Sequence, residues 1–350
     1  MDVVIHAGMP KTGTTALQNA LRAHRGALAD RGVCVPDIDP SRLLGAIVRD
    51  FETLPRPLRH RLPQAGAFRQ AQADAIGILG ECVAGGWSRL VLSSEYLYGA
   101  SAAGLQRLVR ALPGATRLSC VFYVRSPASF YLASLQQRAR ASGSLMTPGD
   151  FLADRVPAEF RYRPLAFIEL CRRALTPNIE VCRYERTHLE GGDIRSDFWR
   201  RAGLDTALLT GETPGEDNAA LSAEAVKLLL EYRRRWHSRK LDDTFLPHGT
   251  VLLSCLADQQ GRANLKSGVG AVIAAGRRSA LEGLRDEHGI VFADVDYGFP
   301  EVAVPWGEGE PVLDDLIDID PQRYGALTLG VIHTLLDRAV RRAARDHQPG

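Results

Sequence analysis

Residues 1–18 read MDVVIHAGMPKTGTTALQ, and this stretch indicates both the fold and the kind of site that the chain is expected to have. An apolar run at residues 3–5 leads into Gly8, and a helical pattern begins at Ala16. Between them lie Lys11, Thr12, Gly13, Thr14 and Thr15. A strand that enters a helix through a glycine-containing turn leaves several backbone N–H groups pointing at one spot, where the helix dipole adds partial positive charge. We therefore predict that residues 8–15 form a loop that binds a phosphate-like anion.

The spacing of the two glycines matches G-x-x-x-x-G-K-[ST], the loop that binds nucleoside triphosphates. In this chain Thr14 stands where that motif has lysine, Thr15 takes the place of its hydroxyl residue, and the lysine is Lys11, inside the loop. Lysine is otherwise scarce, at positions 227, 240 and 266 only. The pattern favours a phosphate site that differs from one for ATP with magnesium. The alternative is a plain strand–turn–helix in which glycine and threonine serve turn and cap geometry.

The pattern H-x-G-x-x-K-T-G-T-T-x-L-Q resembles the N-terminal signature of sulfotransferases, most of all their bacterial branch. The matching residues are Gly8, Lys11, Thr12, Gly13, Thr14, Thr15 and Gln18. The resemblance implies that the loop grips the 5′-phosphosulfate end of 3′-phosphoadenosine 5′-phosphosulfate (PAPS) and that no metal ion is needed. It also implies that Lys11 neutralises the charge that develops on the bridging oxygen as the sulfuryl group leaves.

Strand and helix patterns alternate over the first two-thirds of the chain, which favours an α/β fold with a parallel sheet. Strands are expected at 2–7, 33–35, 90–92, 118–124 and 179–184. Helices are expected at 15–31, 67–84, 104–112, 127–141, 163–175, 221–236, 268–287 and 324–345, and residues 37–63 are expected to be irregular. With the resemblance, this order predicts a P-loop-like three-layer sandwich with a central parallel sheet and a helical C-terminal cover. We expect a single domain over 1–350, with a nucleotide-binding α/β core at 1–210 and a mainly helical extension at 211–350.

Arginine follows one of the expected strands at the edge where parallel sheets bind ligands, the carboxyl ends of the strands. Arg125 opens Y-V-R-S-P-x-x-F-Y-x-x-S, which resembles the sulfotransferase segment that holds the 3′-phosphate of PAPS. In that family a serine on the next helix takes part, usually eight residues after the arginine, where this chain has Ala133. Ser134 is therefore the expected donor, with Ser129 and Ser126 as alternatives. Arg125 could instead be one surface arginine among many.

A carboxylate follows a second strand and is the candidate general base. Glu95 comes after the run at 90–92, and related sulfotransferases have a similar S-S-E element there. A base is needed because the acceptor must lose a proton as the sulfuryl group arrives. The alternatives are that Glu95 has a structural ion pair or cap, and that His60 or His24 is the base. His6, on the first expected strand, is interpreted as a hydrogen-bonded core histidine.

Composition places the chain among ordinary globular proteins. Of its 350 residues 45% are hydrophobic and 24% charged, and the formal net charge is +2. The six cysteines are scattered without a C-x-x-C pair, so we expect reduced thiols. No membrane span or signal peptide is expected, and the expected location is cytoplasmic. The basic run at 233–240 is interpreted as a solvated helix end and not as a nucleic-acid site.

The function expected from these features is transfer of a sulfuryl group from PAPS to a hydroxyl or amine of a small-molecule or glycan acceptor. The rival enzyme is a P-loop small-molecule kinase, which is disfavoured by Thr14 in the lysine position and by the lack of a strand-end aspartate for magnesium. A third alternative is a nucleotide-binding protein without turnover. The identity of the acceptor and the oligomeric state are left open.

Overall fold

The structure is a computed structural model, and its residues group into two compact units. It describes residues 1–9, 11–54, 56–141, 147–153, 155–156, 160–209, 220–237, 245–256, 261–307 and 309–346. The first unit comprises Met1–Ser126, Pro157–Asp217 and Arg277–Tyr297. The second comprises Pro127–Val156, Asn218–Gly276 and Gly298–Gly350. The two units therefore alternate along the sequence, while the single domain expected from the sequence stays a prediction.

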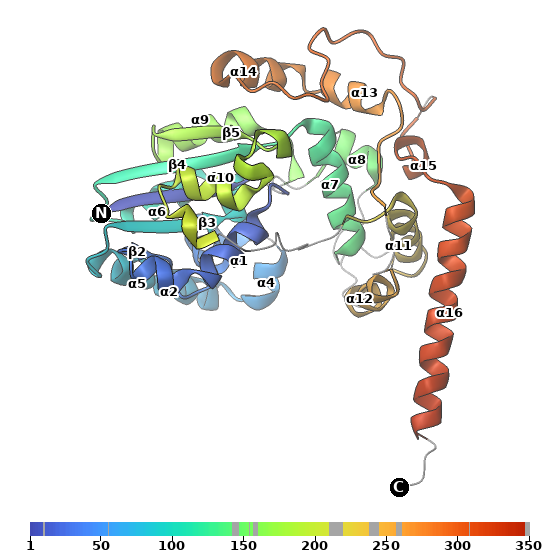
Figure 1. The fold of residues 1–350 in the computed structure, drawn as a ribbon, viewed down its shortest axis with the longest axis horizontal. Helices are drawn as coiled ribbons and strands as arrows, with labels where there is room; N and C mark the ends of the chain where they lie inside the picture. The colour runs from blue at the N-terminus through green and yellow to red at the C-terminus, as the bar shows by residue number, and fades with distance from the viewer. Residues whose placement is uncertain are drawn as a thin grey trace. The chain divides into compact units, whose positions relative to one another are not determined.

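The first unit is built on a five-stranded sheet in which every pairing is parallel, in the order β2-β3-β1-β4-β5 (Figure 1). Its strands are β1 (Asp2–Gly8), β2 (Val33–Cys34), β3 (Arg89–Ser94), β4 (Arg117–Val124) and β5 (Ile179–Arg183). The central strands are near-continuous apolar runs, as expected where both faces of a parallel sheet are covered.

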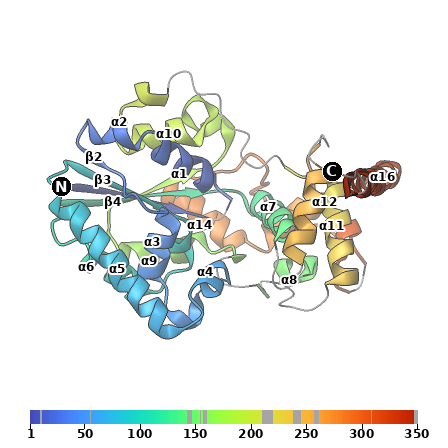
Figure 2. The ribbon, with the colours of Figure 1, turned by 90° about the horizontal axis from the view of Figure 1, so that it is seen from below.

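Helices cover both faces of this sheet, which Figure 2 shows from below. On one face lie α1 (Thr14–Ala23), α2 (Arg25–Ala29) and α10 (Ile194–Arg201). On the other lie α3 (Pro40–Val48), α5 (Ala65–Ala84), α6 (Ala102–Arg110) and α9 (Pro164–Ala174). Two further helices, α4 (Arg56–Arg61) and α14 (Arg278–His288), complete the unit, and α14 packs against α9. The predicted α/β three-layer fold with a central parallel sheet is confirmed.

The two-residue period of the strands divides the core between the two layers. Val4, Val91 and Tyr123 belong to a buried cluster that also contains Leu17 of α1 and Phe198 of α10. Rings on the opposite face pack against one another: Phe122 lies 4.8 Å from Phe167 and Tyr98 lies 5.3 Å from Phe167, between ring centroids.

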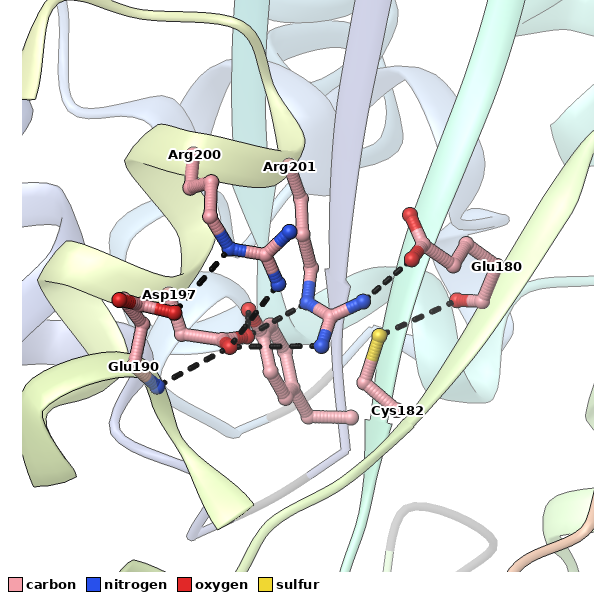
Figure 3. A network of polar contacts seen from close by, with 7 residues as sticks. Glu180, Cys182, Glu190, Asp197, Arg200 and Arg201 are labelled. Carbon is pink, nitrogen blue, oxygen red and sulfur yellow. Dashed lines mark hydrogen bonds and ion pairs between the residues drawn. The ribbon is translucent and has the colours of Figure 1, made fainter.

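A buried polar cluster around Asp197 ties α10 to the sheet (Figure 3). The Tyr123 hydroxyl and the Arg201 guanidinium each donate to Asp197 Oδ2 at 2.6 Å, and the backbone N–H of Glu190 donates to Oδ1 at 3.2 Å. Arg201 also pairs with Glu180 on β5. Burial by itself raises the pKa of the Asp197 carboxyl, but the hydrogen bonds from Arg201 and Tyr123 outweigh it, and the net pKa lies below its usual value.

Three expectations about secondary structure were wrong. Residues 37–63 contain α3, a short 3₁₀ helix at Phe51–Thr53, and α4 in place of an irregular segment. Proline opens α3 and stands in the first turn of α4, positions that it favours, so the prolines of this segment begin helices there. The helix expected at 15–31 is divided at His24, and the helix expected at 268–287 is divided into α13 (Val269–Ala275) and α14.

The second unit is helical. Its helices are α7 (Pro127–Arg140), α8 (Pro148–Leu152), α11 (Ala223–Trp236), α12 (Phe245–Cys255), α13, α15 (Leu313–Leu316) and α16 (Pro321–Asp346). Ser222 caps α11, since its hydroxyl accepts the N–H of Ala225 at 3.2 Å. α16 packs against α11 and α12.

The interpretation of 233–240 as a solvated helix end fails at its first residue. Arg233 is buried and donates to the carbonyl oxygens of Arg138 and Ala141 at 3.0 and 2.5 Å. Its guanidinium also lies 4.9 Å from the ring centroid of Phe245. Arg233 therefore links α7, α11 and α12. Residues 238–240 lie outside the described part of the chain.

Two further features bear on the sequence-based expectations. All six cysteines are free, and four of them are buried. Within the described ranges, no helix combines the length and apolar character needed to cross a membrane.

Candidate functional site

The register of the sheet brings most of the predicted site residues to one edge. Ala7 pairs with Ser94, so Glu95 follows β3 beside Gly8 at the end of β1. Gly8 pairs with Tyr123 and Val124 with Arg183, so Arg125 leaves the sheet on the other side of β1. The residues gathered at this edge are Gly8, Lys11, Thr12, Gly13, Thr14, Thr15, Glu95 and Arg125.

The loop between β1 and α1 turns through two left-handed residues. Gly13 has φ 74° and Lys11 has φ 69°. A Cβ atom on Gly13 would lie 3.0 Å from Ile194 and 3.1 Å from the Tyr184 hydroxyl, so both the dihedral angle and the space require glycine here. The left-handed backbone at Lys11 carries strain of about 1–2 kcal/mol. Such strain is retained at sites where the backbone must present its N–H groups in a set direction.

Gly8 allows the helix to approach the end of β1 closely. A Cβ atom at Gly8 would lie 2.2 Å from Thr14 Oγ1, a separation that no side chain can adopt. Thr14 is buried, and within the described residues its hydroxyl has no hydrogen-bond partner. Buried hydroxyls are normally paired, so the Thr14 hydroxyl is a candidate donor to an anion in this loop.

The first turn of α1 is open to an anion. The N-cap residue is Gly13, which makes no side-chain cap, so the first N–H groups of the helix keep their donor capacity. Thr12 is buried, and its hydroxyl donates a hydrogen bond to the Met9 carbonyl oxygen at 2.7 Å. Because a hydroxyl has one proton to donate, Thr12 stabilises the loop conformation. Thr15 is exposed. Gln18, one turn further, donates to the Ser93 carbonyl oxygen at 3.0 Å and fixes α1 to the end of β3.

Glu95 is half-buried at the start of a 3₁₀ turn, Glu95–Gly99. Burial raises the pKa of its carboxyl, the Lys11 ammonium opposes that shift, and Asp39 adds to it. A carboxylate with a raised pKa is a stronger base than an exposed one and has its proton-accepting range closer to neutral pH. Lys11 is therefore close enough to Glu95 to act on its carboxyl electrostatically.

Asp39, which the sequence analysis did not single out, acts electrostatically on Glu95. It precedes α3, and its carboxylate accepts the N–H of Arg42 at 3.3 Å. It lies in the segment that was expected to be irregular, in a stretch without a recognisable motif. Asp39 also helps to raise the pKa of Tyr96, after burial and Glu95, to about 12.

Arg125 is held against the loop by aromatic and backbone contacts. Its guanidinium donates to the Lys11 carbonyl oxygen at 2.5 Å and lies 5.5 Å from the ring centroid of Tyr184. The hydroxyl of Tyr162 donates to the Arg125 carbonyl oxygen at 3.0 Å. Tyr184 follows β5, where a strand end was expected, whereas Tyr162 stands out by no pattern in the sequence.

The serines named for the 3′-phosphate have different surroundings. Ser134 belongs to α7 in the helical unit, is fully buried, and has no hydrogen-bond partner for its hydroxyl within the described residues. Ser126 donates to Asp294 at 2.6 Å. The side chain of Ser129 is half-buried. Ser134 therefore stays a prediction, while the proton of Ser126 is already engaged.

The three histidines considered in the sequence analysis have different surroundings. His6 is fully buried, its Nδ1 lies 2.9 Å from Ser93 Oγ, and burial lowers its pKa to about 3, so it is the core histidine that was predicted. His24 ends α1 with its ring 6.4 Å from that of Trp199, and His60 is exposed on α4. Neither is a stronger candidate base than Glu95, because Glu95 stands beside Gly8 and interacts with Lys11.

The arrangement offers backbone donors, a lysine and an arginine for an anion, with one carboxylate beside them. In the part of the chain that the structure describes, no group of three or more His, Cys, Asp or Glu side chains is placed to hold a metal ion. The expectation that no metal is needed stays a prediction.

Comparisons with known proteins add little to this picture. No protein-family model matches the chain, and no curated protein matches it. One solved structure that matches is a crystal structure of a sulfotransferase from Alicyclobacillus acidocaldarius, at 14% sequence identity and a TM-score of 0.38. The match covers 75% of this chain and 97% of that one. A likeness this distant carries no argument about activity, so the function must be argued from the site.

Proposed function

We propose that this chain is a sulfotransferase that moves a sulfuryl group from PAPS to a hydroxyl or amine of a small-molecule or glycan acceptor. The observation that carries the proposal is the uncapped first turn of α1, with the unsatisfied Thr14 hydroxyl and Lys11 beside it. These donors suit the doubly charged 5′ end of such a nucleotide. The sulfotransferase-like motif at residues 6–18 supports the same assignment.

The residues at the edge of the sheet fit the donor in two places. Lys11, Thr14 and the first-turn N–H groups of α1 would hold the 5′-phosphosulfate. Arg125 would hold the 3′-phosphate, because a guanidinium can give two parallel hydrogen bonds to one phosphate.

The proposed reaction is an in-line displacement at sulfur. A bond forms between the acceptor oxygen or nitrogen and sulfur, and the bond between sulfur and the 5′-phosphate oxygen breaks. Glu95 takes the proton that the acceptor loses. Lys11 stabilises the negative charge left on the phosphate oxygen, which is where the transition state differs most from the bound donor.

The kinase alternative is disfavoured by the loop. A nucleoside triphosphate loop needs lysine at position 14 to reach the phosphates, but Thr14 is buried against Gly8. Free cysteines, four of them buried, support a reducing compartment and with it the proposed cytoplasmic location.

A thermal-shift experiment separates the three functions. Adenosine 3′,5′-bisphosphate without magnesium should raise the melting temperature of a sulfotransferase, since a ligand at about 100 times its Kd stabilises the native state by about 2.7 kcal/mol. ATP with magnesium should do so for a kinase. A protein without turnover would respond to the bisphosphate yet release no bisphosphate from PAPS with any acceptor in a mixed panel of alcohols, phenols, amines and glycans.

A further inference from the structure

Two of the free cysteines, Cys34 and Cys82, lie next to each other in the α/β unit. Cys34 ends β2, and Cys82 lies in the last turn of α5. The turn that leads from α5 to β3 is fixed beside β2, because the Gly32 carbonyl oxygen accepts the N–H of Ser88 at 2.9 Å and its hydroxyl at 2.8 Å. β2 also pairs with β3, where Cys34 lies opposite Leu90. The thiol groups of Cys34 and Cys82 are joined by a side-chain hydrogen bond.

The hydrogen bond gives the two thiols different reactivities. It lowers the pKa of Cys82, whose thiolate it stabilises, while burial and the charge of Glu81 oppose that shift. The same hydrogen bond, followed by burial, raises the pKa of Cys34, which keeps its proton. The thiolate is the form of cysteine that attacks an oxidant or a disulfide. Cys82 is therefore the nucleophile of the pair, and Cys34 is the thiol that can react with its oxidised form.

Access from solution distinguishes this pair from the other cysteines. Cys82 is partly exposed, whereas Cys34 is buried. Cys120 of β4 and Cys171 of α9 also share a side-chain hydrogen bond, but both side chains are fully buried. An oxidant can therefore reach the first pair through Cys82 and is kept from the second. Cys255 is partly exposed as well, but it is the one cysteine of the helical unit.

We propose that Cys34 and Cys82 form a reversible oxidation site, at which a hydroperoxide links β2 to α5 through a disulfide. The Cys82 thiolate attacks one oxygen of hydrogen peroxide, the O–O bond breaks, and the sulfur becomes a sulfenic acid while hydroxide leaves. The Cys34 sulfur then attacks the Cys82 sulfur, so that an S–S bond forms and the thiol proton leaves with the sulfenic hydroxyl as water. The two thiols lose two electrons, which the peroxide gains. A small dithiol reverses the reaction by thiol–disulfide exchange.

The cross-link restrains the segment between the two cysteines, residues 35–81. This segment contains Asp39, which acts electrostatically on Glu95, and α3, which packs against β3 and against the turn that Glu95 begins. A disulfide that closes a long loop removes chain entropy from the unfolded state and so stabilises the folded unit. In the proposed cytoplasmic location a disulfide is transient, which is typical of a redox sensor. The oxidation state of the pair then determines how firmly α3 is held beside Glu95.

Thiol mapping after peroxide treatment tests the site. The reduced full chain is treated with an equimolar amount of hydrogen peroxide, the remaining thiols are blocked with N-ethylmaleimide in denaturant, and the peptides are identified by mass spectrometry. Wild type should contain Cys34 and Cys82 in one linked peptide that dithiothreitol separates. Cys34→Ala should form no cross-link and leave Cys82 as a sulfenic or sulfinic acid. Cys255→Ser is the matched control, because it removes a partly exposed thiol outside the pair and should cross-link as wild type does.

Calorimetric melting tests the consequence for the α/β unit. Oxidised wild type should melt about 5–15 °C above the reduced form, and dithiothreitol should remove the difference. Cys82→Ser should melt at one temperature with and without peroxide, and circular dichroism confirms that each variant is folded. The proposal would be overturned if wild type kept all six thiols, if Cys34→Ala still formed the cross-link, or if Cys120 and Cys171 were linked instead. A cross-linked wild type that melts as the reduced form does would contradict the restraint of residues 35–81.

Discussion

At the scale of single residues, the account depends most on Glu95 as the base. Glu95→Gln keeps the size of the side chain and its place after β3 but cannot accept a proton. We expect kcat to fall by about 10²–10⁴-fold, with little change in the affinity for adenosine 3′,5′-bisphosphate. Steady-state kinetics would measure the fall in kcat, and nucleotide titration would show whether the affinity is unchanged. A variant that keeps full kcat would return the role to His60, His24 or a residue not yet named.

The pH dependence should respond to Asp39. Burial, and then the negative charge of Asp39, raise the pKa of Glu95 against the opposing effect of Lys11. Asp39→Asn removes that charge while its amide oxygen can still cap α3, so the pKa of Glu95 should fall. The acid limb of the pH profile of kcat should then move to lower pH. Asp37→Asn, two residues away and exposed, is the control that should leave the profile in place.

Gly8 tests the close approach of the loop to α1. In Gly8→Ala the new methyl group meets Thr14 Oγ1 at 2.2 Å and must displace the helix or the side chain. We expect a loss of about 1–3 kcal/mol of stability and weaker nucleotide binding. Gly80→Ala is the control, since a Cβ atom at Gly80 meets nothing within 4 Å and alanine in a helix is favoured over glycine by ~1 kcal/mol. Denaturant unfolding should show a lower free energy of unfolding for Gly8→Ala than for wild type and a higher one for Gly80→Ala.

At the scale of elements, the sequence predicted those features that have a periodic pattern or a motif. The apolar runs gave all five strands, and the strand–glycine–helix pattern of residues 1–18 gave the loop. The prediction of an irregular segment is wrong at α3 and α4, because a proline in the first turn begins a helix there and does not prevent one. It also missed Asp39 and Tyr162, because each reaches the site by tertiary packing and neither belongs to a local pattern. The left-handed backbone of Lys11 could not be foreseen either, since non-glycine residues seldom adopt it.

Helix α10 depends on one buried carboxylate for its attachment to the sheet. Asp197→Ala removes the acceptor of Arg201 and of the Tyr123 hydroxyl and leaves both donors without it. Because breaking a buried pair is costly while Arg201 keeps Glu180, we expect a loss of about 3 kcal/mol in the free energy of unfolding. Urea denaturation would measure it, with Tyr123→Phe as a milder variant that loses about 1 kcal/mol.

The same carboxylate should make the fold sensitive to acid. The pKa of Asp197 is lower in the folded protein than its usual value, so its contribution is complete above the pKa that it has in the unfolded chain, about 3.9. The contribution is lost as the pH falls through the folded-state pKa. In Asp197→Asn the free energy of unfolding should therefore change less steeply as the pH falls below about 5. An unchanged slope would show that other carboxylates carry the acid response.

At the scale of the whole molecule, the site is assembled from distant parts of the chain. Lys11, Glu95 and Arg125 come from separate elements of the α/β unit and lie at one edge of the sheet because parallel strands end there. A nucleotide bound there would contact several elements at once. Its binding should therefore stabilise the unit as a whole, and hydrogen exchange should show protection in β1, β3 and β4 together.

The most direct test of the central claim is calorimetric titration of adenosine 3′,5′-bisphosphate, without magnesium, into wild type and three variants. We predict binding to wild type that Arg125→Ala and Lys11→Ala each weaken about 10–100-fold, the loss expected for a charge-assisted contact of about 1.5–3 kcal/mol. Arg117→Ala, at the opposite end of β4 and exposed, should bind as wild type does. The account would be contradicted if wild type failed to bind the bisphosphate while binding ATP with magnesium, or if Arg125→Ala and Arg117→Ala bound it equally well.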